Sequence, residues 1–181
     1  MNLPNKLTLL RILLVPIFMV FLLTRFKGSY SVYAQYFALG IFILAAITDG
    51  LDGYIARRQG TITRLGKLID PLADKLLISG ALIALVDMGK ITSWPAIIII
   101  GREFAITGLR MIVASEGKII VASSLGKIKT ISQIVAISAV IIGLPYGWVL
   151  IWIAVVVTVI SGLDYFIKSK SFITPENEKN S

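Results

Sequence analysis

The chain contains no cysteine and no histidine, and only 15% of its residues are charged. The absence of cysteine excludes disulfides and thiolate metal sites, and the absence of histidine excludes imidazole as a metal ligand or general base. Side chains of this protein can therefore hold a metal ion only through oxygen atoms, which favours Mg²⁺, Mn²⁺ or Ca²⁺. Soluble domains average about 25% charged residues, so the low charge argues against a soluble protein.

The hydrophobic content of 56% and the mean hydropathy of +0.87 are typical of an integral membrane protein. One span takes about 20 apolar residues, and the pattern predicts six helices, at 7–23, 32–57, 65–88, 93–114, 125–142 and 148–167. The charge-free stretch 130–163 would extend about 50 Å as one helix, so "GLPYG" at 143–147 is expected to divide it. We therefore predict an all-α integral membrane protein with a membrane domain, residues 1–170, and a polar tail, residues 171–181.

The basic residues gather in two predicted loops and indicate how the chain is oriented. Positive residues favour the cytoplasmic side, and the regions around these two loops hold Arg57, Arg58, Arg64, Lys67, Arg110, Lys118, Lys127 and Lys129. Both termini are then expected to be cytoplasmic, with Trp94 and Trp148 at the outer interface. The net charge of +8 could also indicate nucleic-acid binding. Membrane orientation and anionic lipid headgroups explain it, so no nucleic-acid partner is expected.

Four aspartates fall in one short window that joins the second and third predicted helices. Asp49 and Asp52 are three residues apart and Asp70 and Asp74 four, so each pair shares one helix face. The first pair ends a helix that runs toward the cytoplasm and the second begins the returning helix. All four should therefore lie at similar depth near the cytoplasmic side. Carboxylates gathered there repel one another unless divalent cations neutralise them, which predicts a Mg²⁺ or Mn²⁺ site.

Two other interpretations of the aspartates compete with a metal site. The aspartates could be polar helix ends that face water, which would explain one isolated acid better than four at these spacings. Intramembrane acids are also typical of ion transporters. A transport path should cross the bilayer, whereas these acids cluster on one side and the last two predicted helices contain almost none.

Written out, the stretch is Asp49-x₂-Asp52-Gly53-x₂-Ala56-Arg57-x₈-Gly66-x₃-Asp70-x₃-Asp74. It resembles, at every fixed position, the signature of the CDP-alcohol phosphotransferases, which are integral membrane enzymes of phospholipid synthesis. The segments "NLPNKLTLLRI", "GREFAITGLRMIVASEGK" and "SLGKIKT" are similar to the phosphatidylglycerophosphate synthase branch of that family.

The resemblance implies a multi-pass enzyme of the bacterial cytoplasmic membrane. It implies transfer of a phosphatidyl group from CDP-diacylglycerol to sn-glycerol 3-phosphate, with release of CMP. Related members use other acceptors, so phosphatidylglycerol (a cardiolipin synthase), inositol or serine stay open as alternatives. Members of the family often pair, which implies a homodimer.

The resemblance also assigns roles to individual residues. Two divalent ions, Mg²⁺ or Mn²⁺, would be held by Asp49, Asp52, Asp70 and Asp74, and Asp74 would also be the general base. The CDP group would contact Asn5, Thr8, Gly53, Ala56, Arg57 and Gly66. Composition alone offers simpler explanations for three of them, because Asn5 and Thr8 could cap a helix and Arg57 could be an orienting charge.

The acceptor needs a cationic pocket, because glycerol 3-phosphate carries about two negative charges. Arg110 and Lys127 are predicted to bind its phosphate, with Lys129 as a further candidate. Lysines that reach toward lipid headgroups are the alternative. Arg102 and Glu103 lie deeper in the same predicted helix, where a structural ion pair is expected rather than contact with substrate.

Overall fold

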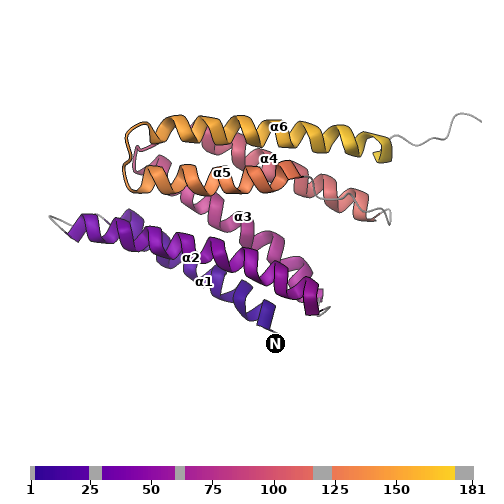
Figure 1. The fold of residues 1–181 in the computed structure, drawn as a ribbon, viewed down its shortest axis with the longest axis horizontal. Coiled ribbons are helices and arrows are strands. Elements are labelled where there is room, and N and C mark those ends of the chain that lie inside the picture. Colours follow the sequence, from indigo (N-terminus) through magenta and orange to yellow (C-terminus); the bar gives the residue numbers. More distant parts are fainter. Residues whose placement is uncertain (1–2, 25–29, 60–63, 116–123, 174–181) are drawn as a thin grey trace, which may run out of the picture.

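The computed structural model describes residues 3–24, 30–59, 64–115 and 124–173, and in this part of the chain all regular structure is α-helical (Figure 1). The helices are α1 (Leu3–Leu23), α2 (Tyr30–Gln59), α3 (Arg64–Asp87), α4 (Ser93–Ser115), α5 (Ser124–Ile141) and α6 (Gly147–Ile173). The six predicted helices are thus confirmed, with ends that differ by a few residues. α6 continues into the first residues of the predicted tail.

The helices form two groups that meet at α3 and through a contact between α2 and α5 (Figure 1). α1 packs against α2 and α3, while α4 and α5 both pack against α6, and α3 also contacts α4 and α5. One end of the bundle carries the starts of α1, α3 and α5 and the ends of α2, α4 and α6 (Figure 1). We call this end the site end, because α2 brings Asp49 and Asp52 toward it and α3 begins there.

At the opposite end, which we call the closed end, short turns connect α3 to α4 and α5 to α6. Gly143, with φ of 70°, and Tyr146, with φ of 62°, lie in the left-handed region and reverse the chain between α5 and α6. The predicted division at "GLPYG" is therefore confirmed. Lys90, between α3 and α4, donates to the carbonyls of Val140 and Ile141 at 3.3 and 2.9 Å. Its ammonium thus caps the C-terminus of α5, where the helix dipole favours a cation.

A continuous apolar core joins the two groups of helices. Phe18 of α1 and Phe42 of α2 are fully buried, with ring centroids 5.6 Å apart, and Phe21 and Phe37 meet edge to face at 4.7 Å. Tilted aromatic pairs of this kind add to the stabilisation that burial alone provides. Leu85 of α3 belongs to the same core, which fixes α3 between the two groups.

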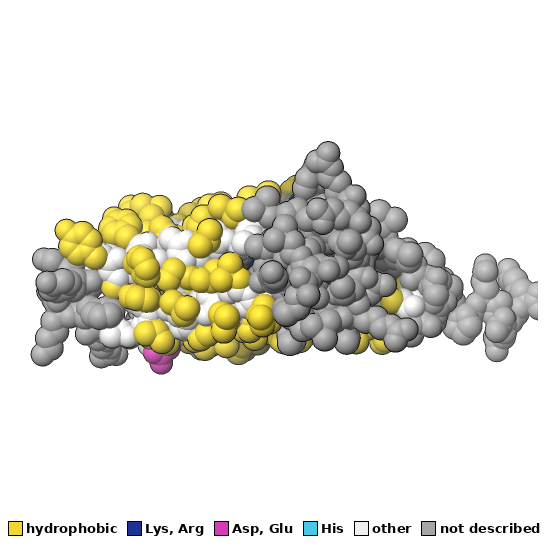
Figure 2. Space-filling view, turned by 90° about the horizontal axis from the view of Figure 1, so that it is seen from below, with side chains coloured by type: hydrophobic (Ala, Val, Ile, Leu, Met, Phe, Trp, Pro, Cys, Tyr) yellow, Lys and Arg dark blue, Asp and Glu magenta, His cyan; other side chains and the backbone are white. Residues whose placement is uncertain are grey.

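The outside of the bundle is more apolar than parts of its inside. On α6 the outward positions are hydrophobic, including Val156, Leu163 and Ile167, whereas Thr158 and Ser161 are buried. Figure 2 shows hydrophobic side chains covering much of the visible described surface. In the described residues, Ser124–Ile141 and Gly147–Ser169 are long and apolar enough to span a membrane, and Thr8–Leu23 and Val32–Thr48 are shorter apolar helices.

Candidate functional site

The four signature aspartates lie on helical backbone near the site end, on α2 and α3. Their side chains lie outside the described residues, so the predicted metal contacts remain predictions. The described residues next to them are buried in the bundle, with Ala45 and Thr48 before the first pair and Ala73 and Leu77 around the second. Carboxylate oxygens suit a hard divalent cation.

The predicted nucleotide residues fall on the same part of the molecule. Thr8 is almost completely buried in α1, and α1 packs only against α2 and α3 in the described part of the chain. Thr8 therefore faces the two helices that carry the signature. The side chains of the other five residues assigned to the CDP group lie outside the described residues; these are Asn5, Gly53, Ala56, Arg57 and Gly66.

Arg11 follows Thr8 by one helical turn and is completely buried. In the sequence, a single arginine near the start of an apolar helix indicates no more than membrane orientation. A buried guanidinium is costly unless it is paired or strongly hydrogen-bonded. Its place on the face of α1 that meets α2 and α3 adds a cation to the surroundings of the candidate site. The sequence did carry a signal, because Arg11 lies three residues after Thr8 and therefore on the same face of α1.

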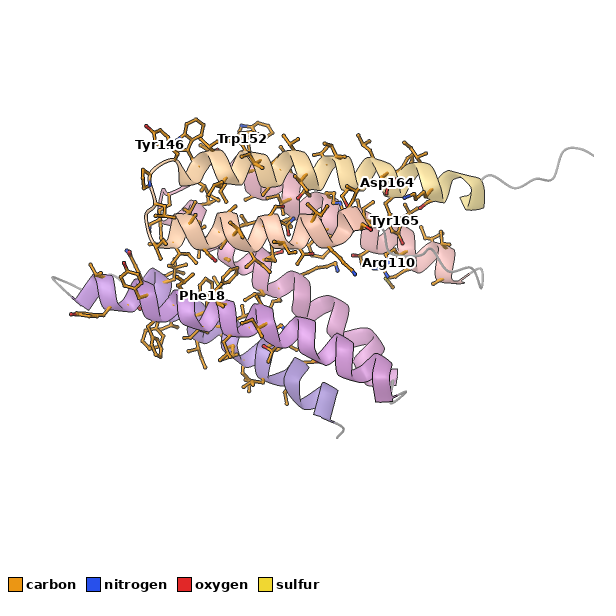
Figure 3. All side chains as sticks on the ribbon, in the orientation of Figure 1. Phe18, Arg110, Tyr146, Trp152, Asp164 and Tyr165 are labelled. Atoms are coloured by element: carbon orange, nitrogen blue, oxygen red, sulfur yellow. The ribbon has the colours of Figure 1, made fainter. Side chains whose placement is uncertain are left out.

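The three predicted acceptor ligands differ in their surroundings. Arg110 is exposed on the part of α4 near the site end, whereas Tyr146 and Trp152 lie at the opposite end (Figure 3). Lys127 is exposed in the first turns of α5. Lys129 is buried, at 9% exposure, and its Nζ donates to Oε1 of Glu103 at 2.6 Å. Arg110 and Lys127 are thus accessible at the site end, and Lys129 is engaged in an ion pair.

The same carboxylate also faces Arg102. Nη1 of Arg102 lies 3.4 Å from Oε1 of Glu103, and Nη2 donates to Oγ of Ser161 at 3.0 Å. Two cations from α4 and α5 therefore share one carboxylate oxygen. The expected Arg102–Glu103 pair is present, but the stronger partner of Glu103 by distance is Lys129. We call Arg102, Glu103 and Lys129 the buried charge cluster.

Neutral polar side chains extend this cluster toward the centre of the bundle. Nε2 of Gln133 donates to Oγ1 of Thr158 at 2.9 Å, and both residues are buried. This bond joins α5 to α6 one helical turn after Lys129, on the side away from the site end. Single polar residues inside long apolar runs were the only signal of this network in the sequence, and they did not reveal which pairs would meet.

Comparison with known proteins shows the family of the chain. Residues 1–160 match the family model described as CDP-alcohol phosphatidyltransferase. The chain belongs to this family. The family inferred from the aspartate signature is thus confirmed over most of the chain, including the helices that carry the four aspartates and the buried charge cluster.

Several curated members of the family are similar to the chain over nearly its whole length. A CDP-diacylglycerol–glycerol-3-phosphate 3-phosphatidyltransferase of Bacillus subtilis is 44% identical, covering 97% of this chain and 99% of its own. An enzyme of the same name from Rickettsia felis is 37% identical, covering 94% and 97%. A probable phosphatidylglycerophosphate synthase of Mycobacterium tuberculosis is 40% identical, covering 93% and 81%.

Proposed function

We propose that the protein transfers the phosphatidyl group of CDP-diacylglycerol to sn-glycerol 3-phosphate, which yields phosphatidylglycerophosphate and CMP. The observation that carries the proposal is the match, at 37% to 44% identity over nearly the full length, to enzymes named for this reaction. In the reaction, the primary hydroxyl of glycerol 3-phosphate forms a bond to the phosphorus that carries diacylglycerol. The bond from this phosphorus to the bridging oxygen of the diphosphate breaks, and CMP leaves with the electron pair.

Asp74 is the proposed general base and takes the proton of the attacking hydroxyl. A carboxylate in this role contributes typically about 10²–10⁴-fold to the rate. Its position one turn after Asp70 on α3 supports the assignment, because both positions then face the same side of the helix.

Asp49, Asp52, Asp70 and Asp74 are proposed to hold two divalent ions, Mg²⁺ or Mn²⁺. When bound, such ions neutralise charge on the diphosphate and stabilise the leaving CMP. The four carboxylates come from two adjoining helices, α2 and α3, and carboxylate oxygens are donors that these ions prefer.

The CDP group is proposed to lie between α1 and the α2–α3 connection. Asn5 and Thr8 would approach it from α1, and Arg57 would pair with a phosphate through its planar donors. Small side chains let the nucleotide approach the helix backbone closely; the positions concerned are Gly53, Ala56 and Gly66. The burial of Thr8 on the face that meets α2 and α3 supports this arrangement.

The phosphate of glycerol 3-phosphate is proposed to bind Arg110 and Lys127, the exposed cations at the site end of α4 and α5. The exposure of Arg110 and Lys127 supports direct contact with a soluble substrate. Lys129, the third candidate, is buried and its Nζ donates to Oε1 of Glu103 at 2.6 Å.

The protein is proposed to cross the bacterial cytoplasmic membrane six times, with both termini and the site on the cytoplasmic side. The apolar outer face of α6, opposite buried hydroxyl groups, supports contact with lipid. Exposed Trp94 and Trp148 near the closed end support placement of that end at an interface. Pairing of two copies into a homodimer is part of the proposal.

The proposal is tested by measuring CMP release from CDP-diacylglycerol by the purified protein with Mg²⁺ or Mn²⁺. The acceptors are glycerol 3-phosphate, phosphatidylglycerol, inositol and serine, each added alone. We expect release with glycerol 3-phosphate. Release with another acceptor only would assign the protein to a different activity of the family, and no release with any of them would refute the proposal.

A further inference from the structure

α4 and α5 are held apart near the site end. Both helices pack against α6, yet in the described residues no Cα atom of α4 lies within 8 Å of a Cα atom of α5. The ion pair between Glu103 and Lys129 spans this separation, with Nζ and Oε1 at 2.6 Å. A buried ion pair thus joins two helices whose backbones do not touch.

The α4 side of this connection rests on α6. Ser161 accepts the hydrogen bond from Nη2 of Arg102, and Gly162 lets the arginine lie flat against the helix. A methyl group added at Gly162 would come within 3.1 Å of Nε and 3.2 Å of Cγ of Arg102. The side chain of Arg102 is thus fixed at its guanidinium and along its stem, and Nη1 faces the carboxylate of Glu103.

The α5 side also rests on α6. Gln133 lies one turn after Lys129 and bonds to Thr158, so the face of α5 that carries Lys129 is fixed against α6 as well. Polar contacts of the cluster and its neighbours thus join all three pairs of helices: α4 with α6, α5 with α6, and, through Glu103 and Lys129, α4 with α5. In a low-dielectric interior, paired charges with further hydrogen bonds have one strongly preferred geometry.

The proposed acceptor ligands lie on the site-end side of this connection. Arg110 follows Glu103 by seven residues, which is close to two turns and places it on the same face of α4, roughly 10 Å nearer that end. Lys127 precedes Lys129 by two residues in the antiparallel helix, roughly 3 Å nearer the same end. It lies on the outward face of α5, with the exposed Ile131 and Val135. The spacing of α4 and α5 at the cluster therefore sets the position of Arg110 relative to the start of α5.

We propose that the buried charge cluster is a positioning device, in which Glu103 and Lys129 form a strut that sets the separation of α4 and α5 and thereby the position of Arg110 for the acceptor phosphate. The inference rests on the proposed function and deepens it. Lys129 contributes by holding α5 at a fixed distance from α4. A phosphate bound by two cations needs both at a defined separation, because misplacement of a binding group costs productive geometry.

The first test uses Glu103→Gln, which keeps the shape of the side chain and removes its charge. If the ion pair is a strut, KM for glycerol 3-phosphate should rise by about three- to tenfold, because the affinity for the acceptor falls by the same factor. KM for CDP-diacylglycerol should stay within about twofold. If Lys129 instead binds the phosphate directly, removal of its competing carboxylate should leave or lower KM for glycerol 3-phosphate, and this result would overturn the proposal.

A second variant, Gly162→Ala, disturbs the cluster while every charge is kept. Gly101→Ala is the matched control, because it adds the same methyl group to a helix beside Arg102 and meets no atom within 4 Å. Both changes bring the same gain in helix propensity. We expect Gly162→Ala to raise KM for glycerol 3-phosphate and Gly101→Ala to leave it unchanged. Equal KM values for glycerol 3-phosphate in the two variants would contradict the role of the contact between Arg102 and α6.

A distance measurement tests the strut without any assay of activity. The chain has no cysteine, so Met111→Cys on α4 and Ile128→Cys on α5 provide two unique, exposed sites for spin labels. Double electron–electron resonance should give a narrow distance distribution in the parent and a broader or shifted one with Glu103→Gln. An unchanged distribution would refute the strut, whereas failure of the parent to use glycerol 3-phosphate would refute the proposed function and leave this readout valid.

Discussion

The two lysine ion pairs of the described bundle should differ sharply in their contribution to stability. Lys129 lies 2.6 Å from Glu103, with both side chains only 11% exposed, and Lys168 lies 2.8 Å from Asp164 on a side chain that is 52% exposed. The distances are nearly equal, so burial is the main difference. The same substitution, lysine to methionine, can therefore be compared at the two sites.

The expected loss in free energy of unfolding depends on whether the remaining carboxylate is buried or exposed. Lys129→Met leaves a buried carboxylate with Arg102 at 3.4 Å and the side chain of Gln133 as partners, and removal of one partner from a buried pair costs about 3–5 kcal/mol. We expect about 3 kcal/mol, because Arg102 retains part of the compensation. Lys168→Met removes an exposed pair within one helix, which contributes about 0.3–0.5 kcal/mol.

The assay is thermal unfolding of the purified proteins in the same detergent. For a chain of this size, 1 kcal/mol shifts Tm by about 2–4 °C, so Lys129→Met should lower Tm by about 6–12 °C and Lys168→Met by less than about 2 °C. Replacing both members, with Glu103→Leu and Lys129→Met together, should recover part of the loss, because no carboxylate is then left uncompensated. Equal Tm values for the two single variants would refute the burial argument.

Three further predictions concern catalysis and folding. Asp74→Asn should lower kcat by about 10²–10⁴-fold while CDP-diacylglycerol still binds, as measured by turnover and by lipid binding; full activity would exclude Asp74 as the base. Removal of divalent ions with a chelator should abolish CMP release, and Mg²⁺ or Mn²⁺ should restore it, whereas activity that survives chelation would contradict the metal assignment. Lys90→Met should lower the free energy of unfolding by about 1 kcal/mol, through loss of the α5 cap, with both KM values unchanged; a changed KM would show that the closed end communicates with the site.

The helices were predictable because their physical causes are local. Apolar runs of sufficient length, separated by charged loops, gave all six, and the break at "GLPYG" followed from glycine and proline chemistry. The left-handed conformation of Tyr146 was not predicted. A non-glycine residue adopts it only when the surrounding turn requires it, and that requirement depends on how α5 and α6 pack.

The family was predictable because its signature is a pattern of fixed spacings in one stretch of chain. The structure adds where this stretch lies, on two helices that adjoin α1 with its buried Thr8 and Arg11. The role of Arg11 was not foreseen, because a charge near the start of an apolar helix is explained equally well by membrane orientation.

The buried charge cluster was predictable only in part. Adjacent Arg102 and Glu103 in an apolar helix indicated an internal ion pair, and the pair is present. Two other contacts join segments that are distant in the sequence. They are the ion pair between Glu103 and Lys129 and the packing of Arg102 against Ser161 and Gly162. Such contacts depend on the relative rotation of three helices, which periodicity within one helix does not determine.

The central claim is the chemical identity of the reaction, and product analysis tests it most directly. Purified protein supplied with CDP-diacylglycerol, glycerol 3-phosphate and Mg²⁺ is followed by mass spectrometry of both the lipid and the nucleotide products. The account predicts phosphatidylglycerophosphate and CMP in equal amounts. CMP without phosphatidylglycerophosphate, or neither product, would contradict it.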